Sequence, residues 1–197
     1  MRIIAGRFRG RRLAGVRGRM RPTADRVREA IFNILGPGLE EVRVLDLFAG
    51  TGALGIEALS RGARQAVFVE HDSTALQVLR KNLASCGLGA ATQVLPLPVP
   101  RALKQLAVQA QRFELIFLDP PYGKGLAAQS LELLAQRPLL RAGGRVVVEH
   151  GVHDLVPEHR GSLIQVDQRR YGDTRVSFYL SFRAGDVNQA ADKEYSY

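Results

Sequence analysis

The sequence predicts an α/β protein of the Rossmann-like type, with a mostly parallel sheet and helices on both of its faces. Short apolar runs, rich in β-branched and aromatic residues, alternate with segments of helical periodicity through the middle of the chain. Three carboxylates stand at or near the ends of these runs, namely Asp46, Glu70 and Asp119. Because the carboxyl ends of parallel strands lie along one edge of a sheet, we expect a ligand site at that edge.

At the N-terminus, residues 2–5 and 11–13 can pair as a short hairpin around two glycines, Gly6 and Gly10. Thr23 is suited to cap the helix that follows. That helix is predicted by a stripe of apolar residues and ends at a Gly-Pro-Gly sequence. The stripe consists of Val27, Ala30, Ile31 and Ile34.

The remaining elements alternate as expected for parallel strands joined by helices. Helices are predicted over residues 53–61, 73–85, 100–110 and 126–136. Strands are predicted over residues 43–48, 65–70, 91–95, 113–118 and 145–149. The last of these strands is expected to follow a turn at a Gly-Gly pair, and a closing hairpin then pairs residues 163–169 with residues 175–181.

Length and composition limit the class of protein. The chain has 197 residues, of which 46% are hydrophobic, so it can build a substantial core. No uninterrupted apolar stretch approaches membrane-spanning length. The single cysteine, Cys86, fits a reducing compartment, and the four histidines form no metal-ligand pattern. We therefore expect a cytoplasmic protein without a metal ion, and we expect a monomer. Its predicted parts are a basic extension (1–38), an α/β domain (39–182) and a disordered tail (183–197).

The net charge of +9 is concentrated at the N-terminus, since residues 1–28 hold ten arginines and only one acid, Asp25. A mobile or hairpin-like arm of arginines and glycines on a neutral body predicts a polyanionic partner such as a nucleic acid. The alternatives are a solvated tail and an organelle transit peptide, and the second is disfavoured because no amphipathic, serine-rich stripe is present. The expected nucleic-acid contacts are Arg7, Arg9, Arg11, Arg12 and Arg21.

A nucleoside site is predicted where an apolar strand runs into a glycine-rich turn at Gly50, Gly52 and Gly55. The spacing G-x-G-x-x-G lets the backbone approach a ligand and opens a helix N-terminus onto it. Glu70 follows Gly50 by twenty residues and ends the next apolar run, where a carboxylate can bind ribose hydroxyls. The alternative is a turn whose glycines only permit tight packing.

Asp46 helps to choose among nucleoside ligands. A carboxylate beside the glycine-rich turn repels a pyrophosphate and suits a ligand that carries an ammonium group and no phosphate. S-adenosylmethionine is such a ligand, so this residue favours it over a nicotinamide dinucleotide. The alternative is that Asp46 caps the turn.

A second site is predicted by the four residues Asp119-Pro120-Pro121-Tyr122, which follow the apolar run at 113–118. The two prolines fix the backbone and remove two N–H donors, which leaves a carbonyl to face a ligand. A carboxylate, a carbonyl and an aromatic ring together suit a planar group with an exocyclic amine. The alternative is a turn capped by Asp119, with Tyr122 in the core.

With these motifs in place, the chain resembles the class I S-adenosylmethionine-dependent methyltransferases and, more closely, the bacterial 16S rRNA guanine-N2 methyltransferase family. The Asp-Pro-Pro-Tyr motif is shared with adenine-N6 methyltransferases. The N-terminal segments 1–6, 21–23 and 25–33 together narrow the resemblance to the guanine-N2 family. The segments that carry it are 1–6, 21–23, 25–33, 46–52, 54–63, 69–70, 118–122 and 171–174.

The resemblance implies methylation of one guanine amine in the rRNA of an assembled or partly assembled small ribosomal subunit. It also implies a seven-stranded sheet whose final strand is antiparallel, with residues 21–33 covering the cofactor pocket. Residues 94–99 depart from the family because they offer no polar partner for the cofactor's adenine. The implied cofactor contacts are Thr23, Asp46, Phe48, Gly50, Thr51, Gly52, Glu70 and Asp119.

The resemblance also assigns catalytic roles. Asp119 and the Pro120 carbonyl orient the guanine amine and stabilise its developing positive charge, and Tyr122 stacks on the base. Three rivals remain: an adenine-N6 methyltransferase acting on DNA or RNA, a catalytically silent RNA-binding protein of the same fold, and a nicotinamide enzyme. The last is disfavoured by Asp46 and by the segment 119–122.

Overall fold

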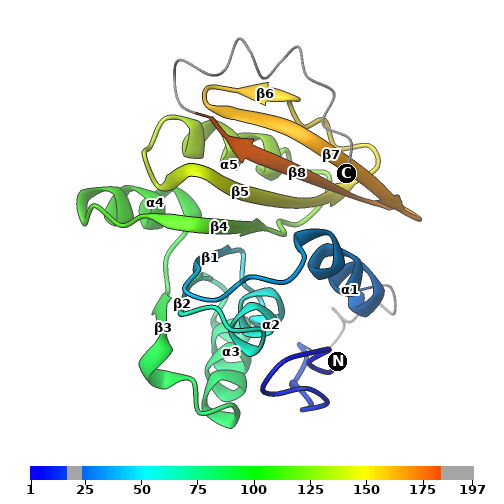
Figure 1. Cartoon of the computed structure of the whole chain (residues 1–197). Helices are drawn as coiled ribbons and strands as arrows, with labels where there is room; N and C mark the ends of the chain where they lie inside the picture. The colour runs from blue at the N-terminus through cyan, green and yellow to red at the C-terminus, as the bar shows by residue number, and fades with distance from the viewer. Residues whose placement is uncertain (17–23, 183–197) are drawn as a thin grey trace. The chain divides into compact units, whose positions relative to one another are not determined.

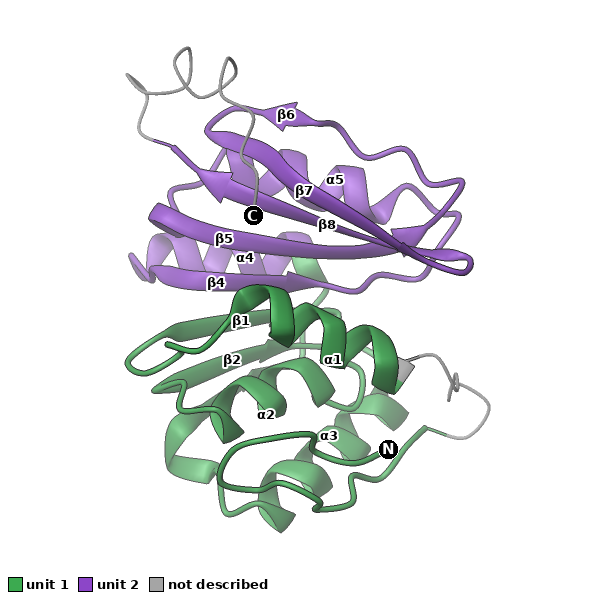
Figure 2. Ribbon diagram, turned by 45° about the vertical axis from the view of Figure 1, so that its right-hand side comes forward, with its two compact units in different colours: residues 1–99 green, residues 100–197 purple. Residues whose placement is uncertain are grey.

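The computed structural model describes residues 1–16 and 24–182. The chain divides into two compact units, Met1–Val99 (unit 1) and Pro100–Tyr197 (unit 2), which are coloured separately in Figure 2. This division differs from the predicted functional parts, which stay predictions. Thr23, Arg21 and the tail from residue 183 lie outside the described residues, so the expectations for them stay predictions as well.

Unit 1 is a parallel three-stranded sheet with helices, as predicted (Figure 1). Its strands lie in the order β3-β2-β1, so that Leu45 pairs with Val67 and Val67 with Gln93. The strands are β1 (Arg43–Leu47), β2 (Gln65–Val69) and β3 (Thr92–Leu95). The helices are α1 (Ala24–Leu35), α2 (Ala53–Ser60), α3 (Ser73–Ser85) and the short 3-10 helix η1 (Gly89–Ala91).

The core of unit 1 forms because the apolar runs of β1 and β2 are buried on both faces. Helix α3 begins where the Asp72 carboxylate accepts a hydrogen bond from the Ala75 amide at 2.8 Å, and Cys86 is buried at its end. The stripe predicted for α1 is wrong in part. Ala30 and Ile34 are only half-buried, because the buried face is rotated toward Arg28, Phe32 and Leu35.

The N-terminal residues form the predicted hairpin. Arg2 and Arg12 make an antiparallel bridge, and the Ile3 amide donates to the Arg11 carbonyl at 3.0 Å. Gly6 stands at the turn with φ +79°, and a Cβ added there would lie 1.8 Å from the Ser60 carbonyl oxygen. The hairpin therefore rests directly on α2 at a point where only glycine fits.

Unit 2 contains helix α4 (Val99–Val108) except for its first residue, helix α5 (Leu126–Ala135) and five strands in the order β4-β5-β8-β7-β6. Strands β4 and β5 are parallel, and the pairs β5–β8, β8–β7 and β7–β6 are antiparallel. The strands are β4 (Phe113–Leu118), β5 (Leu140–Gly151), β6 (His159–Arg160), β7 (Leu163–Tyr171) and β8 (Thr174–Ser181). The predicted antiparallel final strand, β8, is confirmed.

Two expectations for the sheet are wrong. The described residues form eight strands rather than seven, because the two-residue strand β6 adds an antiparallel edge that is too short to leave a periodic pattern. Strand β5 begins at Leu140 rather than at residue 145, so the Gly-Gly pair lies inside the strand. The pairing with β4 shifts register there, between Phe113 and Leu115, which accounts for glycines within a strand.

Neither a membrane segment nor a metal cluster is seen in the part of the chain that the structure describes. None of its helices is long and apolar enough to cross a membrane. Within residues 1–16 and 24–182, no three His, Cys, Asp or Glu side chains are grouped so that they could hold a metal ion.

Candidate active site

The glycine-rich turn joins β1 to α2 in unit 1, as predicted. Phe48 already has a positive φ of 63°, and Gly52, with φ +80°, is the N-cap of α2. The turn is closed by the Gly52 amide, which donates to the Ala49 carbonyl at 2.7 Å, and it is tied to β2 by the Ala49 amide, which donates to the Val69 carbonyl at 2.9 Å. The sharp reversal thus aims the start of α2 at the carboxyl end of the sheet.

The three glycines of the turn have different surroundings. A Cβ at Gly52 would lie 2.4 Å from the Leu79 side chain, and a Cβ at Gly55 would lie 2.3 Å from the Phe68 ring. These two positions therefore satisfy the tight-packing interpretation. At Gly50 the nearest atom to an added Cβ is the Phe48 carbonyl oxygen, at 3.9 Å, so this backbone segment is the one that a ligand can approach.

Replacing Gly55 by alanine is expected to lower the stability of unit 1. The added methyl would meet the rigid Phe68 ring, with its Cε1 at 2.3 Å and its Cζ at 2.7 Å, and overpacking of this kind costs about 1–3 kcal/mol. A urea titration followed by fluorescence or circular dichroism measures the change. Gly89→Ala is the matched control, because no atom lies within 4 Å of a Cβ added there. Equal midpoints for the two variants would contradict this packing.

Asp46 is buried below the turn. One of its oxygens, Oδ2, accepts a hydrogen bond from the Gly55 amide at 3.0 Å, so the capping contact considered as an alternative is present. Burial raises the pKa of the Asp46 carboxyl, the hydrogen bond from Gly55 lowers it, and the Glu70 carboxylate raises it, so that together they bring it to about 7. The carboxyl therefore exchanges its proton near neutral pH.

Glu70 holds the turn in place. Its carboxylate accepts hydrogen bonds from three backbone amides, those of Gly50 at 2.9 Å, His71 at 2.7 Å and Asp72 at 2.8 Å. Glu70 and Gly50, both predicted to contact the cofactor, are twenty residues apart in the sequence and are joined here by a hydrogen bond. The sequence pattern predicted a ribose contact for Glu70 and did not reveal this positioning of the turn.

Asn82 is a further residue of this region that sequence reasoning missed. Its Nδ2 donates to the carbonyl oxygens of Thr51 at 2.9 Å and Ala14 at 3.1 Å, and its Oδ1 accepts from the Ala14 amide at 2.8 Å. Asn82 is buried, and it thereby ties the glycine-rich turn to the N-terminal hairpin. An amide side chain between the buried Leu79 and Leu83 of α3 was the available signal.

The second predicted site lies in unit 2, where β4 ends in Asp119-Pro120-Pro121-Tyr122. Asp119 is exposed and Pro120 is buried. Tyr122 is half-buried, and its hydroxyl donates to Glu149 Oε1 at 2.7 Å and lies 3.1 Å from Thr174 Oγ1. Burial, followed by the Glu149 carboxylate, raises the pKa of Tyr122, which therefore keeps its proton.

The residues that fix this segment were also missed from the sequence. Asp154 accepts hydrogen bonds from the amides of Gly123 and Gly151, each at 2.9 Å, and so joins the segment to the end of β5. Together with Glu149 and Thr174, it holds the Tyr122 ring in one position. Tyr122 is half-buried rather than enclosed in the core, and its proposed contact with a base stays a prediction.

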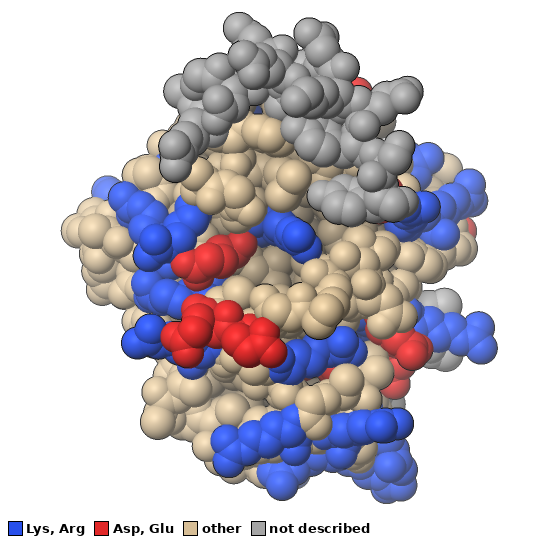
Figure 3. Space-filling view, in the orientation of Figure 1, with Lys and Arg blue, Asp and Glu red and all other residues tan. Residues whose placement is uncertain are grey.

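The predicted arginines of the hairpin are exposed. The guanidinium groups of Arg7 and Arg11 lie 5.3 and 5.5 Å from the centre of the Phe8 ring. Arg9 and Arg12 are exposed on the same hairpin, and Arg21 lies outside the described residues. Figure 3 shows basic side chains, without acidic ones, at the lower end of the face that it draws.

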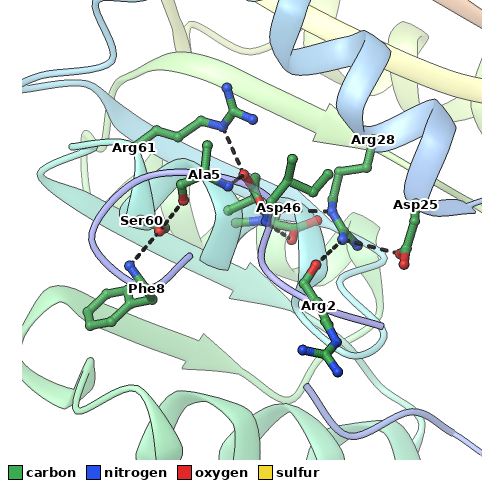
Figure 4. Close-up of polar contacts among 11 residues, drawn as sticks. Arg2, Ala5, Phe8, Asp25, Arg28, Asp46, Ser60 and Arg61 are labelled. Atoms are coloured by element: carbon green, nitrogen blue, oxygen red, sulfur yellow. Dashed lines mark hydrogen bonds and ion pairs between the residues drawn. The ribbon is translucent and has the colours of Figure 1, made fainter. Parts of the chain in front are cut away.

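The buried carboxylate of Glu57, on α2, anchors the N-terminal hairpin to this helix. The polar contacts of this region are drawn in Figure 4. Glu57 accepts hydrogen bonds from the amides of Ile4 at 2.8 Å and Ala5 at 3.0 Å, and it is only 1% exposed. Its charge is balanced by Arg61, whose Nε lies at 2.9 Å, and by Arg28, whose Nε lies at 3.8 Å.

Further contacts complete the anchor. The Ser60 hydroxyl accepts from the Phe8 amide at 3.0 Å and donates to the Ala5 carbonyl at 2.6 Å. The Arg28 guanidinium donates to the Arg2 carbonyl and forms an ion pair with Asp25, with 3.2 Å between Nη2 and Oδ1. The Arg28 side chain is only 4% exposed, so it is buried beneath the hairpin and does not belong to the group of exposed arginines. The N-terminal arm is thus hairpin-like and docked along residues 1–16.

These features define the class of protein. A Rossmann-like unit with a glycine-rich turn and acidic strand ends, followed by a strand that ends in Asp-Pro-Pro-Tyr and an antiparallel hairpin, is the architecture of a class I methyltransferase. The fold expected from the sequence is confirmed by similarity to solved structures. A structure described as "Putative methyltransferase yhhF from Escherichia coli" is 35% identical and covers 92% of this chain and 98% of that one, with a TM-score of 0.79.

The chain belongs to the family described as "Conserved hypothetical protein 95", which matches residues 1–180. It is 42% identical over 180 residues to "Putative rRNA methyltransferase YlbH" of Bacillus subtilis, covering 91% of this chain and 98% of that protein. It is 40% identical over 158 residues to "Ribosomal RNA small subunit methyltransferase D" of Escherichia coli, covering 80% and 78%. The resemblance to the bacterial 16S rRNA methyltransferase family is confirmed.

Proposed function

We propose that this protein transfers the methyl group of S-adenosylmethionine to the exocyclic N2 amine of a guanine in 16S rRNA, acting on an assembled or partly assembled small subunit. The observation that carries the proposal is the segment 119–122, in which an exposed carboxylate stands beside an aromatic ring whose hydroxyl is fixed by Glu149 and Thr174. The names of the relatives support the class of substrate.

The polar groups of unit 1 fit the proposed cofactor. The carboxylates of Asp46 and Glu70 stand beside the turn, which suits an ammonium group and ribose hydroxyls and disfavours a pyrophosphate. Asp46 is held through Oδ2, and we assign Oδ1 to the ammonium. The open backbone at Gly50, with Phe48, Thr51 and Gly52, is assigned to the same ligand. The cofactor contact predicted for Thr23 also stays part of the proposal, although this residue lies outside the described part of the chain.

The residues of unit 2 are assigned to the base. The guanine amine is a poor nucleophile because its lone pair is delocalised into the ring. Hydrogen bonds to the Asp119 carboxylate and the Pro120 carbonyl would orient the amine and stabilise the positive charge that develops on nitrogen. The cofactor supplies an activated methyl group, so alignment does much of the remaining work. The proton then leaves to Asp119 or to water.

The proposed substrate also needs a surface for RNA. Arg7, Arg9, Arg11, Arg12 and Arg21 are assigned to it, since guanidinium groups bind phosphates in a bidentate manner and stack on bases. The target guanine must leave any helical stack before its amine can be methylated. The docked hairpin presents its arginines without a cost for ordering the segment on binding.

The raised pKa of Asp46 predicts a pH dependence of cofactor affinity. An ammonium ligand binds the ionised carboxylate, so below the pKa of about 7 a proton must be lost on binding, and affinity falls by about tenfold per pH unit. Titrations from about pH 5.5 to 7 keep the ligand's own amine charged, because an α-amine has a pKa of about 7.7–8.0.

Isothermal titration calorimetry with S-adenosylmethionine measures this dependence. In Asp46→Asn the carboxamide can still accept the hydrogen bond from Gly55 but does not titrate, so its affinity is expected to be lower and independent of pH over this range. If the wild-type protein shows the same flat profile, Asp46 is not the partner of the ammonium.

The proposed function is tested by incubating the protein with methyl-labelled S-adenosylmethionine and three acceptors: small subunits that lack the modification, naked 16S rRNA and DNA. Label in the rRNA of the subunits is expected. Label in DNA alone would favour the adenine-N6 alternative. Bound cofactor with no label in any acceptor would favour the catalytically silent RNA-binding protein.

A further inference from the structure

We propose that the hairpin of residues 1–16 and the exposed side of α3 form one RNA-binding surface, in which Arg80 and Lys81 extend the group of hairpin arginines. We call this surface the hairpin–α3 surface. The inference rests on the proposed function for its ligand, the phosphate backbone of RNA. It adds residues that lie far from the arginine-rich N-terminus in the sequence.

Charge is the first observation. Residues 1–16 contain five arginines and no acid, and all five are exposed. Helix α3 carries Arg80 and Lys81, both exposed, and has no Asp or Glu over its thirteen residues. These two elements together present seven cationic side chains and no carboxylate. Their charge is therefore complementary to the phosphate backbone of RNA, whereas a protein partner would present charges of both signs.

Direct contact between the two elements is the second observation. The Arg11 guanidinium donates to the Ser85 carbonyl, and the Ala14 backbone exchanges two hydrogen bonds with the Asn82 side chain. Since residues four apart share one side of a helix, Lys81 lies one turn from Ser85 and hence near Arg11. Arg80 precedes Lys81 in the chain and is also exposed, so the two cations extend the basic surface of the hairpin along α3 within unit 1.

The third observation links this surface to the cofactor turn. The same Asn82 amide that holds Ala14 also donates to the Thr51 carbonyl, at 2.9 Å. Asn82 thus fixes the hairpin relative to the glycine-rich turn. RNA bound along the hairpin–α3 surface would therefore be held at a defined place relative to that turn, which makes Asn82 a positioning residue.

The competing interpretation is a solvated helix face whose cations bind nothing. Helix α4 offers a matched control, because it also carries an exposed arginine and an exposed lysine, Arg101 and Lys104, and contains no acid. The double variants Arg80→Gln/Lys81→Gln and Arg101→Gln/Lys104→Gln remove the same charge from two helices. Any effect of net charge alone is then the same in both.

The affinity of each double variant for naked 16S rRNA is measured as a function of salt concentration. Each phosphate contact contributes about 0.7 to 0.9 to the slope of log K against log salt, so the α3 variant is expected to lose about 1.5 from the slope magnitude. The α4 variant should keep the wild-type slope. Both variants should keep the wild-type melting temperature and cofactor affinity.

Two outcomes would overturn the hairpin–α3 surface: a wild-type slope in the α3 variant, or an equal loss in both double variants. Failure of the proposed function is distinguishable from either one. If the wild-type protein binds RNA and transfers no methyl group to it, the methyltransferase assignment fails while the slopes still test the surface.

Discussion

Asp119→Ala is expected to slow methyl transfer to RNA severely while the protein stays folded and still binds its cofactor. The proposal gives Asp119 the task of stabilising positive charge as the guanine nitrogen is methylated. Loss of one preorganised group of this kind lowers the rate by about 10²–10³-fold. The side chain is exposed, so its truncation leaves no cavity in the core. Single-turnover kinetics with labelled cofactor measure the rate, and calorimetry measures cofactor affinity.

Two further variants sharpen this test. Asp119→Asn keeps the shape and an acceptor oxygen but loses the charge, so an intermediate rate is expected. Asp173→Ala removes an exposed carboxylate from the turn between β7 and β8 and should leave the rate unchanged. Normal turnover by Asp119→Ala would rule out its assigned role.

Glu57→Ala is expected to have the largest effect on stability. Alanine leaves the buried Arg28 without its buried carboxylate partner, and the amides of Ile4 and Ala5 without acceptors. Arg28 is only 4% exposed, and the removal of its guanidinium from water lowers the pKa of this group. Breaking a buried ion pair from one side costs about 3–5 kcal/mol. In a chain of this size, the melting temperature should fall by on the order of 10 °C.

Differential scanning calorimetry measures the effect, and Glu132→Ala supplies the control. Glu132 is also a helical glutamate paired with an arginine at 2.9 Å, but both partners are about half exposed, so the pair is worth at most about 1 kcal/mol. Glu57→Ala should also weaken RNA binding, because the hairpin loses its anchor on α2. Equal melting temperatures for the two variants would show that Glu57 is not the anchor.

Much of the fold could be predicted because its signals are local. The apolar runs of β1, β2 and β4 are bounded by glycines, prolines or acids, and the structure places these strands within a residue or so of the predicted limits. Strand β6 escaped prediction because two residues carry no period. The start of β5 was missed because a Gly-Gly pair indicates a turn, whereas here it lies at a shift of register.

The candidate site likewise has a part that could be predicted from local sequence and a part that could not. The glycine-rich turn and the Asp-Pro-Pro-Tyr segment are continuous in the sequence, so their motifs could be recognised. The groups that hold them act across long separations: Asn82 reaches Thr51 and Ala14, Glu57 reaches Ile4, and Glu149 reaches Tyr122. Only the structure shows those pairings. For Asn82 and Glu57 the available sequence signal was a polar residue within an apolar helical stripe.

The most direct test of the proposed function is the identity of the methylated nucleoside. Small subunits that lack the modification are incubated with the protein and labelled S-adenosylmethionine, and their 16S rRNA is digested to nucleosides and separated by chromatography with mass detection. The account predicts that the label appears in N2-methylguanosine. Label in N6-methyladenosine instead would contradict the assignment of the guanine amine as the acceptor.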